Sequence, residues 1–238
     1  MGAFFYGVSL QWRLDLRSKT LLITCYLVPL LFFAVMGGVF TAIQPGARDT
    51  LLPSMTVFGV TMGAMIGLPP SLVEVYGSDV KKLYQANGVP LSLGLVLSNL
   101  SAFLHLFLMS GLLYLAAPLA FDARLPANPA AHFGGTALLI AASLGVASVI
   151  GLAVKDQAKT SMASILVFLP SILFSGILFP AELLPEAFAL VGNLFPATWG
   201  YRLLTGEAAG LSGLWPLLVL LLASAMLCIL LLRRARSG

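Results

Sequence analysis

Six long stretches without a charged side chain constrain this 238-residue chain more than any other feature. Each is longer than the roughly 20 residues that a helix needs to cross a hydrocarbon layer about 30 Å thick. A membrane barrel would instead show short alternating segments, so continuous apolar runs favour helices. We therefore predict an all-α membrane protein with six transmembrane helices. The uncharged stretches cover residues 20–47, 50–73, 83–121, 125–154, 160–181 and 208–232.

The composition leaves no room for a soluble domain. Only 9% of the residues are charged and the mean hydropathy is +1.00, too little polarity to coat a soluble globule. We expect residues 1–238 to form a single transmembrane domain. Cys25 and Cys228 both fall inside predicted spans, where they serve better as small apolar residues than as a disulfide or metal site. The N-terminus does not resemble a cleavable signal, because its apolar run is broken at Gln11 to Lys19.

The basic residues predict how the chain is oriented. Ten of the 13 lie in the N-terminal segment, the second-to-third loop, the fourth-to-fifth loop and the C-terminal tail. The positive-inside rule then places both termini in the cytoplasm, in a multi-pass protein of the cell (inner) membrane. Lipids are its expected surroundings, and no nucleic-acid partner is expected. The ten are Arg13, Arg17, Lys19, Lys81, Lys82, Lys155, Lys159, Arg233, Arg234 and Arg236, against Arg48, Arg124 and Arg202 outside.

Small residues and prolines refine the spans, which we place near residues 20–43, 51–73, 92–117, 134–153, 161–179 and 213–232. Gly59, Gly63 and Gly67 recur every four residues in the second span. Small residues at this period allow neighbouring helices to approach closely. The glycine pattern therefore predicts tight packing around the second span.

An N-terminal interfacial helix is predicted over residues 1–19, ahead of the first span. An apolar stripe recurs every four residues, while Asp15 and its polar neighbours occupy the other faces. Such a helix can lie at the membrane surface with its aromatic side in lipid. The alternative is a simple positively charged anchor. The stripe consists of Phe4, Val8, Trp12 and Leu16.

The most polar connector, residues 74–90, lies on the predicted cytoplasmic side. Ser78 is a suitable N-cap for a short helix that would run to Asn87, before Gly88 and Pro90 end it. The alternative is a solvated loop that merely anchors the second span.

Residues 180–212 form the other unusual connector, on the predicted outer side. It is too apolar for a free loop and too interrupted by Pro180, Pro185 and Pro196 for a span. We predict a re-entrant or surface-lying helical hairpin, which must be shielded by neighbouring helices. Glu182 and Glu186 are four residues apart and would share a face toward water.

The sequence argues against catalysis by this chain alone. It has no G-x-x-x-x-G-K-[ST] loop for phosphate, and His105 and His132 do not belong to a metal-binding cluster. Ser175 lacks the flanking glycine expected of an intramembrane nucleophile. His105 is the lone titratable residue within a span, and a packed, hydrogen-bonded role suits it better than proton transfer. Energy for directed transport would therefore come from another polypeptide, and we expect no metal or catalytic residue here.

Three patterns occur in a characteristic order along the chain. The first is the six-span layout behind an amphipathic N-terminal helix. The second is Glu74, Gly77, Lys82-Leu83 and Gly88-Val89-Pro90. The commonest form of this motif contains a Gly-Thr pair, which this chain lacks. The third is Ser175-Gly176-Ile177-Leu178-Phe179-Pro180, then Leu184-Pro185, then Phe195-Pro196-Ala197-Thr198-Trp199. Together they resemble the ABC-2 type permease family, the membrane subunits of ABC exporters for drugs, antibiotics, lipids and polysaccharides.

The resemblance implies specific partners and sites. A separate nucleotide-binding ATPase subunit would bind ATP and Mg, and the permease would pair with a second copy of itself or a paralogous permease. Spans one and five would face the dimer axis, with Phe32, Phe33, Phe168 and Phe174 as wall residues. A coupling helix in the 74–90 segment would dock on the ATPase, and the external re-entrant segment would contain Pro180, Glu182, Glu186 and Pro196. The implied coupling residues are Glu74, Gly77, Asp79, Lys81, Lys82, Leu83 and Tyr84.

The leading hypothesis is thus the permease subunit of an ATP-driven exporter for an amphipathic or lipid-like substrate. The alternatives are a non-transporting assembly or binding module, or a lipid scramblase of similar shape. An intramembrane enzyme is a third reading, tied to Ser175 or His105.

Overall fold

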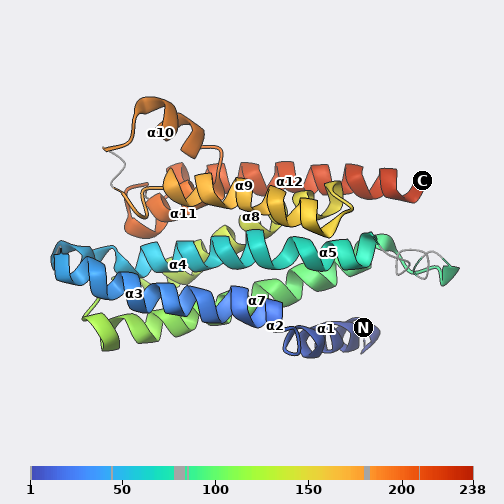
Figure 1. Cartoon of the computed structure of the whole chain (residues 1–238), viewed down its shortest axis with the longest axis horizontal. Helices are drawn as coiled ribbons and strands as arrows, with labels where there is room; N and C mark the ends of the chain where they lie inside the picture. The colour runs from blue at the N-terminus through green and yellow to red at the C-terminus, as the bar shows by residue number, and fades with distance from the viewer. Residues whose placement is uncertain are drawn as a thin grey trace.

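The computed structural model describes residues 2–43, 45–77, 84, 86–179, 183–208 and 210–237, and the regular elements in those residues are all helices. The long helices lie side by side in one bundle (Figure 1). Both termini lie at one end of this bundle, and α10 and α11 lie at the other. In chain order the elements are α1 (Gly2–Asp15), α2 (Lys19–Leu22), η1 (Ile23–Leu27), α3 (Val28–Ile43), η2 (Pro45–Asp49), α4 (Leu51–Met62), η3 (Gly63–Gly67), α5 (Leu68–Tyr76), α7 (Leu91–Phe121), α8 (Pro129–Ala153), α9 (Gln157–Leu173), α10 (Glu186–Gly192), α11 (Pro196–Thr205) and α12 (Leu211–Ser237).

Five helical runs in the described residues are long and apolar enough to cross a membrane. They coincide with five of the six spans predicted from the uncharged stretches. Two of them are continuous helices that contain a π-helical turn, η1 in the first and η3 in the second. The five runs are Lys19–Ile43, Leu51–Tyr76, Leu91–Phe121, Pro129–Ala153 and Leu211–Arg234.

The predicted fifth span corresponds to the shorter apolar helix α9, which has 17 residues. At 1.5 Å per residue it is about 26 Å long, less than a hydrocarbon core of about 30 Å. The helix ends at Leu173 rather than near residue 179, because the chain turns there and Gly176 adopts a left-handed backbone with φ of +90°. A sixth crossing by α9 therefore remains a proposal.

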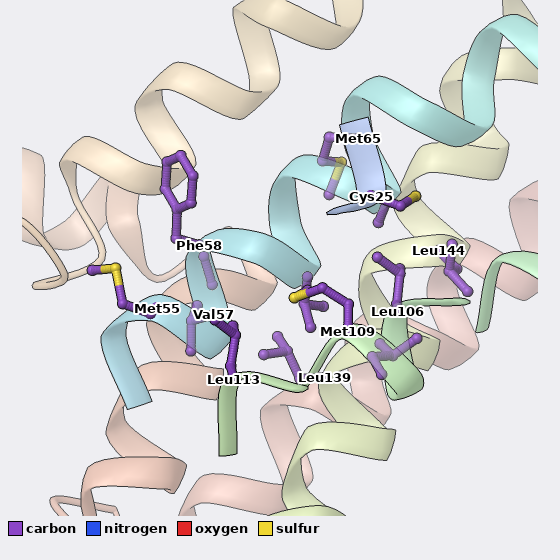
Figure 2. Close-up of a cluster of buried hydrophobic side chains, with 14 of the residues drawn as sticks. Cys25, Met55, Val57, Phe58, Met65, Leu106, Met109, Leu113, Leu139 and Leu144 are labelled. Carbon is purple, nitrogen blue, oxygen red and sulfur yellow. The ribbon is translucent and has the colours of Figure 1, made fainter. Parts of the chain in front are cut away.

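The run α4–η3–α5 is the centre of the bundle. In its most apolar stretch, 89% of the residues are buried inside the protein. It is surrounded by α3, α7, α8, α9 and α11. Figure 2 shows the core around α4, where Val57 lies near Leu113 while Phe58 points to the opposite side of the helix. The packing of this one helix thus positions the others.

The glycine pattern of the second span marks close helix contacts, as the sequence predicted. A β-carbon at Gly59 would lie 2.6 Å from Met109 Cε of α7. One at Gly63 would overlap the Leu106 side chain, and one at Gly67 would lie 3.1 Å from Thr24 Oγ1 in η1. The three glycines therefore allow α7 and the first span to approach the central helix, which is how small residues act in membrane bundles.

We expect Gly63→Leu to destabilise the bundle, because its side chain must displace Leu106. Overpacking of a core typically costs about 1–3 kcal/mol, and each kcal/mol lowers the thermal midpoint of a chain of this size by roughly 2–4 °C. The measurement is thermal unfolding of the detergent-purified protein.

Gly111→Ala in α7 is the matched control, since a β-carbon there has no atom within 4 Å. Its midpoint should stay the same or rise slightly. Equal loss in both variants would show that the position of the glycine does not matter.

Candidate functional site

Helices α3 and α9 flank the central α4 (Figure 1). Aromatic side chains link the three helices. The Phe32 and Phe58 rings are stacked, with centroids 3.7 Å apart and an interplanar angle of 11°. Phe58 also makes an edge contact with Phe168 of α9 at 6.0 Å. Phe32 and Phe168 thus share one buried neighbour. We call Phe32, Phe58 and Phe168 the aromatic ledge.

Two other predicted wall residues lie elsewhere. Phe33 is only 5% exposed and packs edge-on against Phe121 of α7 at 5.2 Å, so it faces the inside of the subunit. Phe174 follows α9 and stacks on Phe188 of α10 at 4.9 Å. Phe58 was not expected from the sequence, because nothing in the second span distinguishes a ledge residue from a core residue.

The surfaces of α3 and α9 are strongly apolar. Leu31 of α3 is 60% exposed and Leu166 of α9 is 64% exposed. Unlike α4, these helices leave much of their apolar surface for lipid or for another protein. The further exposed residues are Leu27 at the end of η1, Val35 and Val39 on α3, and Met162, Ile165 and Leu169 on α9.

A cavity of about 340 Å³ lies at the end of the ledge helices opposite the chain termini. It is bounded by Phe40, which follows Phe32 along α3, by the 175–179 segment and by Tyr201 and Arg202 of α11. Ser175 is held in its wall, where its hydroxyl donates to the Ile172 carbonyl at 2.8 Å and accepts from the Ile177 amide at 3.3 Å. These bonds make Ser175 a local cap rather than an activated nucleophile.

The second half of the external motif fastens α10 to α11. Thr198 Oγ1 donates to the Gly192 carbonyl at 2.7 Å, and Trp199 Nε1 donates to the Asn193 carbonyl at 2.9 Å. Arg202 lies over the Trp199 ring at 5.2 Å and donates to Asn193 Oδ1 at 3.0 Å. The Thr-Trp pair of the motif therefore closes the turn between two helices.

The predicted external hairpin consists of two dissimilar short helices. Helix α11 begins with the buried Pro196 and packs against α4, α8, α9 and α12. Helix α10 lies outside the bundle (Figure 1), with Glu186 exposed in its first turn. A carboxylate there is favourable, since helix N-termini carry partial positive charge. Pro180 and Glu182 lie outside the described residues, and a re-entrant path stays a prediction.

The predicted coupling segment is described at its two ends. Glu74 is exposed in the last turn of α5, and the Gly77 amide donates to the Val73 carbonyl at 2.7 Å as the helix ends. Gly77 also lies against the α8–α9 connector, since a β-carbon there would be 2.9 Å from the Lys155 carbonyl oxygen. At the other end Tyr84 packs near Gly94 of α7. Asp79, Lys81, Lys82 and Leu83 lie outside the described residues.

The N-terminal helix α1 packs against α7, and this corrects the predicted lipid-facing position of Trp12, whereas Leu16 of the same stripe is 46% exposed. The Trp12 ring stacks on His105 of α7, with centroids 3.9 Å apart and an interplanar angle of 4°. His105 is itself fully buried, and its Nδ1 shares a hydrogen bond of 2.8 Å with the Tyr26 hydroxyl. His105 is therefore packed and hydrogen-bonded, as the sequence favoured, and Trp12 contacts protein rather than lipid.

Asp15, expected on a water-facing side of α1, is only 8% exposed. Its carboxylate accepts hydrogen bonds from the Ser101 hydroxyl and from Gln11 Nε2, the latter at 2.9 Å. Burial raises the pKa of the Asp15 carboxyl above its ordinary 3.8, and the hydrogen bonds from Ser101 and Gln11 partly oppose this rise. We call Trp12, Asp15, Ser101 and His105 the α1–α7 polar contact.

Among the described residues, no three His, Cys, Asp or Glu side chains are grouped to hold a metal. The sequence matches the family described as ABC-2 type transporter over residues 3–207, from the first turn of α1 to just beyond α11. The chain belongs to the ABC-2 type transporter family. A comparison with curated proteins gave no match.

Membership in this family assigns a role to the chain. The chain is the membrane subunit of an ABC transporter, a transport component that is not itself catalytic. The matched region contains the α1–α7 polar contact, the aromatic ledge and the α10–α11 turn, while α12 lies beyond it. In this permease, α1 is thus part of the packed domain rather than an appended anchor.

The raised pKa of Asp15 predicts a specific pH dependence. The packed state binds a proton more tightly than the unfolded chain, so its stability should fall as pH rises from 3.8 through the raised pKa. Asp15→Asn keeps an acceptor for Ser101 but cannot ionise. We expect thermal unfolding of the variant to lose this pH dependence and to gain stability at neutral pH, by roughly 2–4 °C per kcal/mol.

Asp49→Asn is the control. It removes an exposed carboxylate that pairs with Arg124 at 3.1 Å, far from α1, and should leave the response to pH intact. A wild-type response that survives in Asp15→Asn would contradict the assignment.

Proposed function

We propose that this chain is the permease subunit of an ATP-driven exporter. The substrate would be an amphipathic or lipid-like molecule, such as a drug, antibiotic, lipid or glycan, taken from the cytoplasm or inner leaflet. Hydrolysis would occur in a separate nucleotide-binding subunit. The observation that carries this proposal is the aromatic ledge between α3 and α9, inside a chain of the ABC-2 family.

The ledge suits a substrate path between two subunits. Two copies of the chain, or this chain and a paralogous permease, would meet along α3 and α9 and bury their exposed apolar side chains. Phe32 and Phe168 are half-buried and Phe58 supports both, so the rings would form a firm apolar wall for the hydrophobic part of the substrate. The cavity near Tyr201 and Arg202 would receive the substrate at the outer end.

The cytoplasmic ends of the helices would transmit force from the ATPase to the substrate path. The ATPase would bind the segment between α5 and α7, including Asp79, Lys81, Lys82 and Leu83. Gly77 touches the connector that leads into α9, and α5 itself packs against α9. A push on this segment would therefore reach both the central helix and a ledge helix as one rigid-body movement.

We propose six crossings in the cell (inner) membrane, with α9 and residues 174–179 forming the fifth. Both termini and the ends of α5 and α8 would face the cytoplasm, in agreement with the ten basic residues placed there. The α10–α11 pair would cover the outer face.

We expect Phe32→Ala and Phe168→Ala to reduce export several-fold, because each removes a ring that contacts Phe58 and so opens the ledge. The measurement is ATP-dependent efflux of a fluorescent amphipathic dye from cells, normalised to the amount of permease in the membrane. Phe133→Ala is the matched control, since that ring belongs to a separate cluster with Phe107 and Tyr114. Equal efflux in all three variants would show that the ledge does not line the substrate path.

A second prediction concerns coupling. Joint charge reversal, Lys81→Glu with Lys82→Glu, should lower substrate-stimulated ATP hydrolysis several-fold in the complex with the co-purified ATPase, while the thermal midpoint stays unchanged. Arg48→Glu at the opposite end is the control and should behave as wild type.

Normal coupling in the Lys81/Lys82 variant would contradict the proposed docking segment. Lipid movement that needs no ATP would instead favour a scramblase, and a chain that brings down no ATPase would favour an assembly module.

A further inference from the structure

An apolar groove runs along the outside of the bundle between α7 and α12. Its cavity has a volume of about 500 Å³, within the range of roughly 300–1,000 Å³ typical of small-molecule sites. Val96 and Phe103 of α7 form one wall, and Ala225 and Ile229 of α12 form the other. None of the groove residues belongs to α3 or α9, so the groove is separate from the proposed substrate path.

The groove exists because α12 packs closely along α8 and has few contacts with α7. Gly145 of α8 lies so near Ser224 that a β-carbon there would overlap the serine hydroxyl. Small side chains on α8 and α12 thus bring these two helices together and leave α7 apart. The space between α7 and α12 is then floored by α8.

The polar groups in the floor are satisfied by each other. Asn99 Nδ2 donates to Ser148 Oγ at 2.9 Å, and Ser148 Oγ lies 3.2 Å from Asn99 Oδ1. Asn99 also donates to the Leu95 carbonyl at 2.9 Å. A ligand in the groove therefore meets hydrocarbon rather than unpaired donors, which suits an acyl chain.

One end of the groove contains an arginine. A second cavity, of about 610 Å³, shares Ser92, Ile229 and Leu232 with the first and continues it to Arg233. This end also contains the start of α7, whose first turn has no acidic residue. A helix N-terminus and a nearby arginine both favour an anion. The two cavities together form an apolar slot that ends at Arg233.

We propose that this groove binds one anionic phospholipid of the leaflet that contains the chain termini. An acyl chain lies along α8 between Val96 and Ala225, and the phosphate lies at Arg233. The lipid would fill the gap between α7 and α12, which have few direct contacts. It is a resident lipid rather than the transported substrate, because it lies away from the ledge.

The test measures binding of phosphatidylglycerol and phosphatidylcholine to the purified full-length chain by native mass spectrometry. Wild type should prefer phosphatidylglycerol and should lose that preference as salt is raised. Ala225→Phe fills the slot and should weaken binding of both lipids about tenfold, the loss expected when roughly two methylene groups no longer fit. Arg233→Gln should weaken only phosphatidylglycerol, by about fivefold.

Ala223→Phe is the matched control, since Ala223 is exposed on the same helix but does not line the groove. It should bind both lipids as wild type does. Equal affinity for the two lipids in wild type, or equal binding by Ala225→Phe and Ala223→Phe, would overturn the proposal. If Ala225→Phe does not fold, Arg233→Gln still decides, because an unchanged lipid preference contradicts the site.

Discussion

Close packing around one buried helix is the constraint on which the rest of this structure depends. Lipid tails are as apolar as leucine, so burial of hydrocarbon alone does not drive helices together in a membrane. Here Gly59, Gly63 and Gly67 let α7 and the first span approach the α4–η3–α5 run to contact distance. The other helices are then arranged around this run. Helices α3 and α9 lie on its two sides with apolar surface still uncovered.

That arrangement separates two kinds of apolar surface. The faces of α3 and α9 flank the stacked rings of Phe32 and Phe58, which are joined to Phe168. The space between α7 and α12 has a charged end at Arg233. A subunit interface needs extended complementary surfaces, whereas a single lipid needs a slot with a place for its phosphate. The two surfaces differ in this way, and they lie on different helices.

The sequence predicts five of the long spans and the helical character of the connector before the last span, because both depend on local chemistry. A run without charge must be a helix in lipid, and Pro196 begins α11. Thr198 and Trp199 donate to nearby carbonyls at the end of α10. The sequence did not predict that α9 ends at Leu173. The turn at Gly176 uses a left-handed backbone, which a glycine permits but does not require. Trp12 and Asp15 were placed wrongly, since their partners His105 and Ser101 are on a helix far along the chain. Periodicity tells which residues share a face, but it does not tell what covers that face.

The contact between Asp15 and Ser101 joins residues 86 positions apart and has a consequence for the order of biosynthesis. When α1 leaves the ribosome, neither Ser101 nor His105 has been made, so the carboxylate has no shelter and must stay hydrated. Only after the third span has been synthesised and inserted can Trp12 find its stacking partner. Helix α1 is therefore translated first but packs into the bundle later than the two spans that follow it. Its packing requires that the first three spans are already in place.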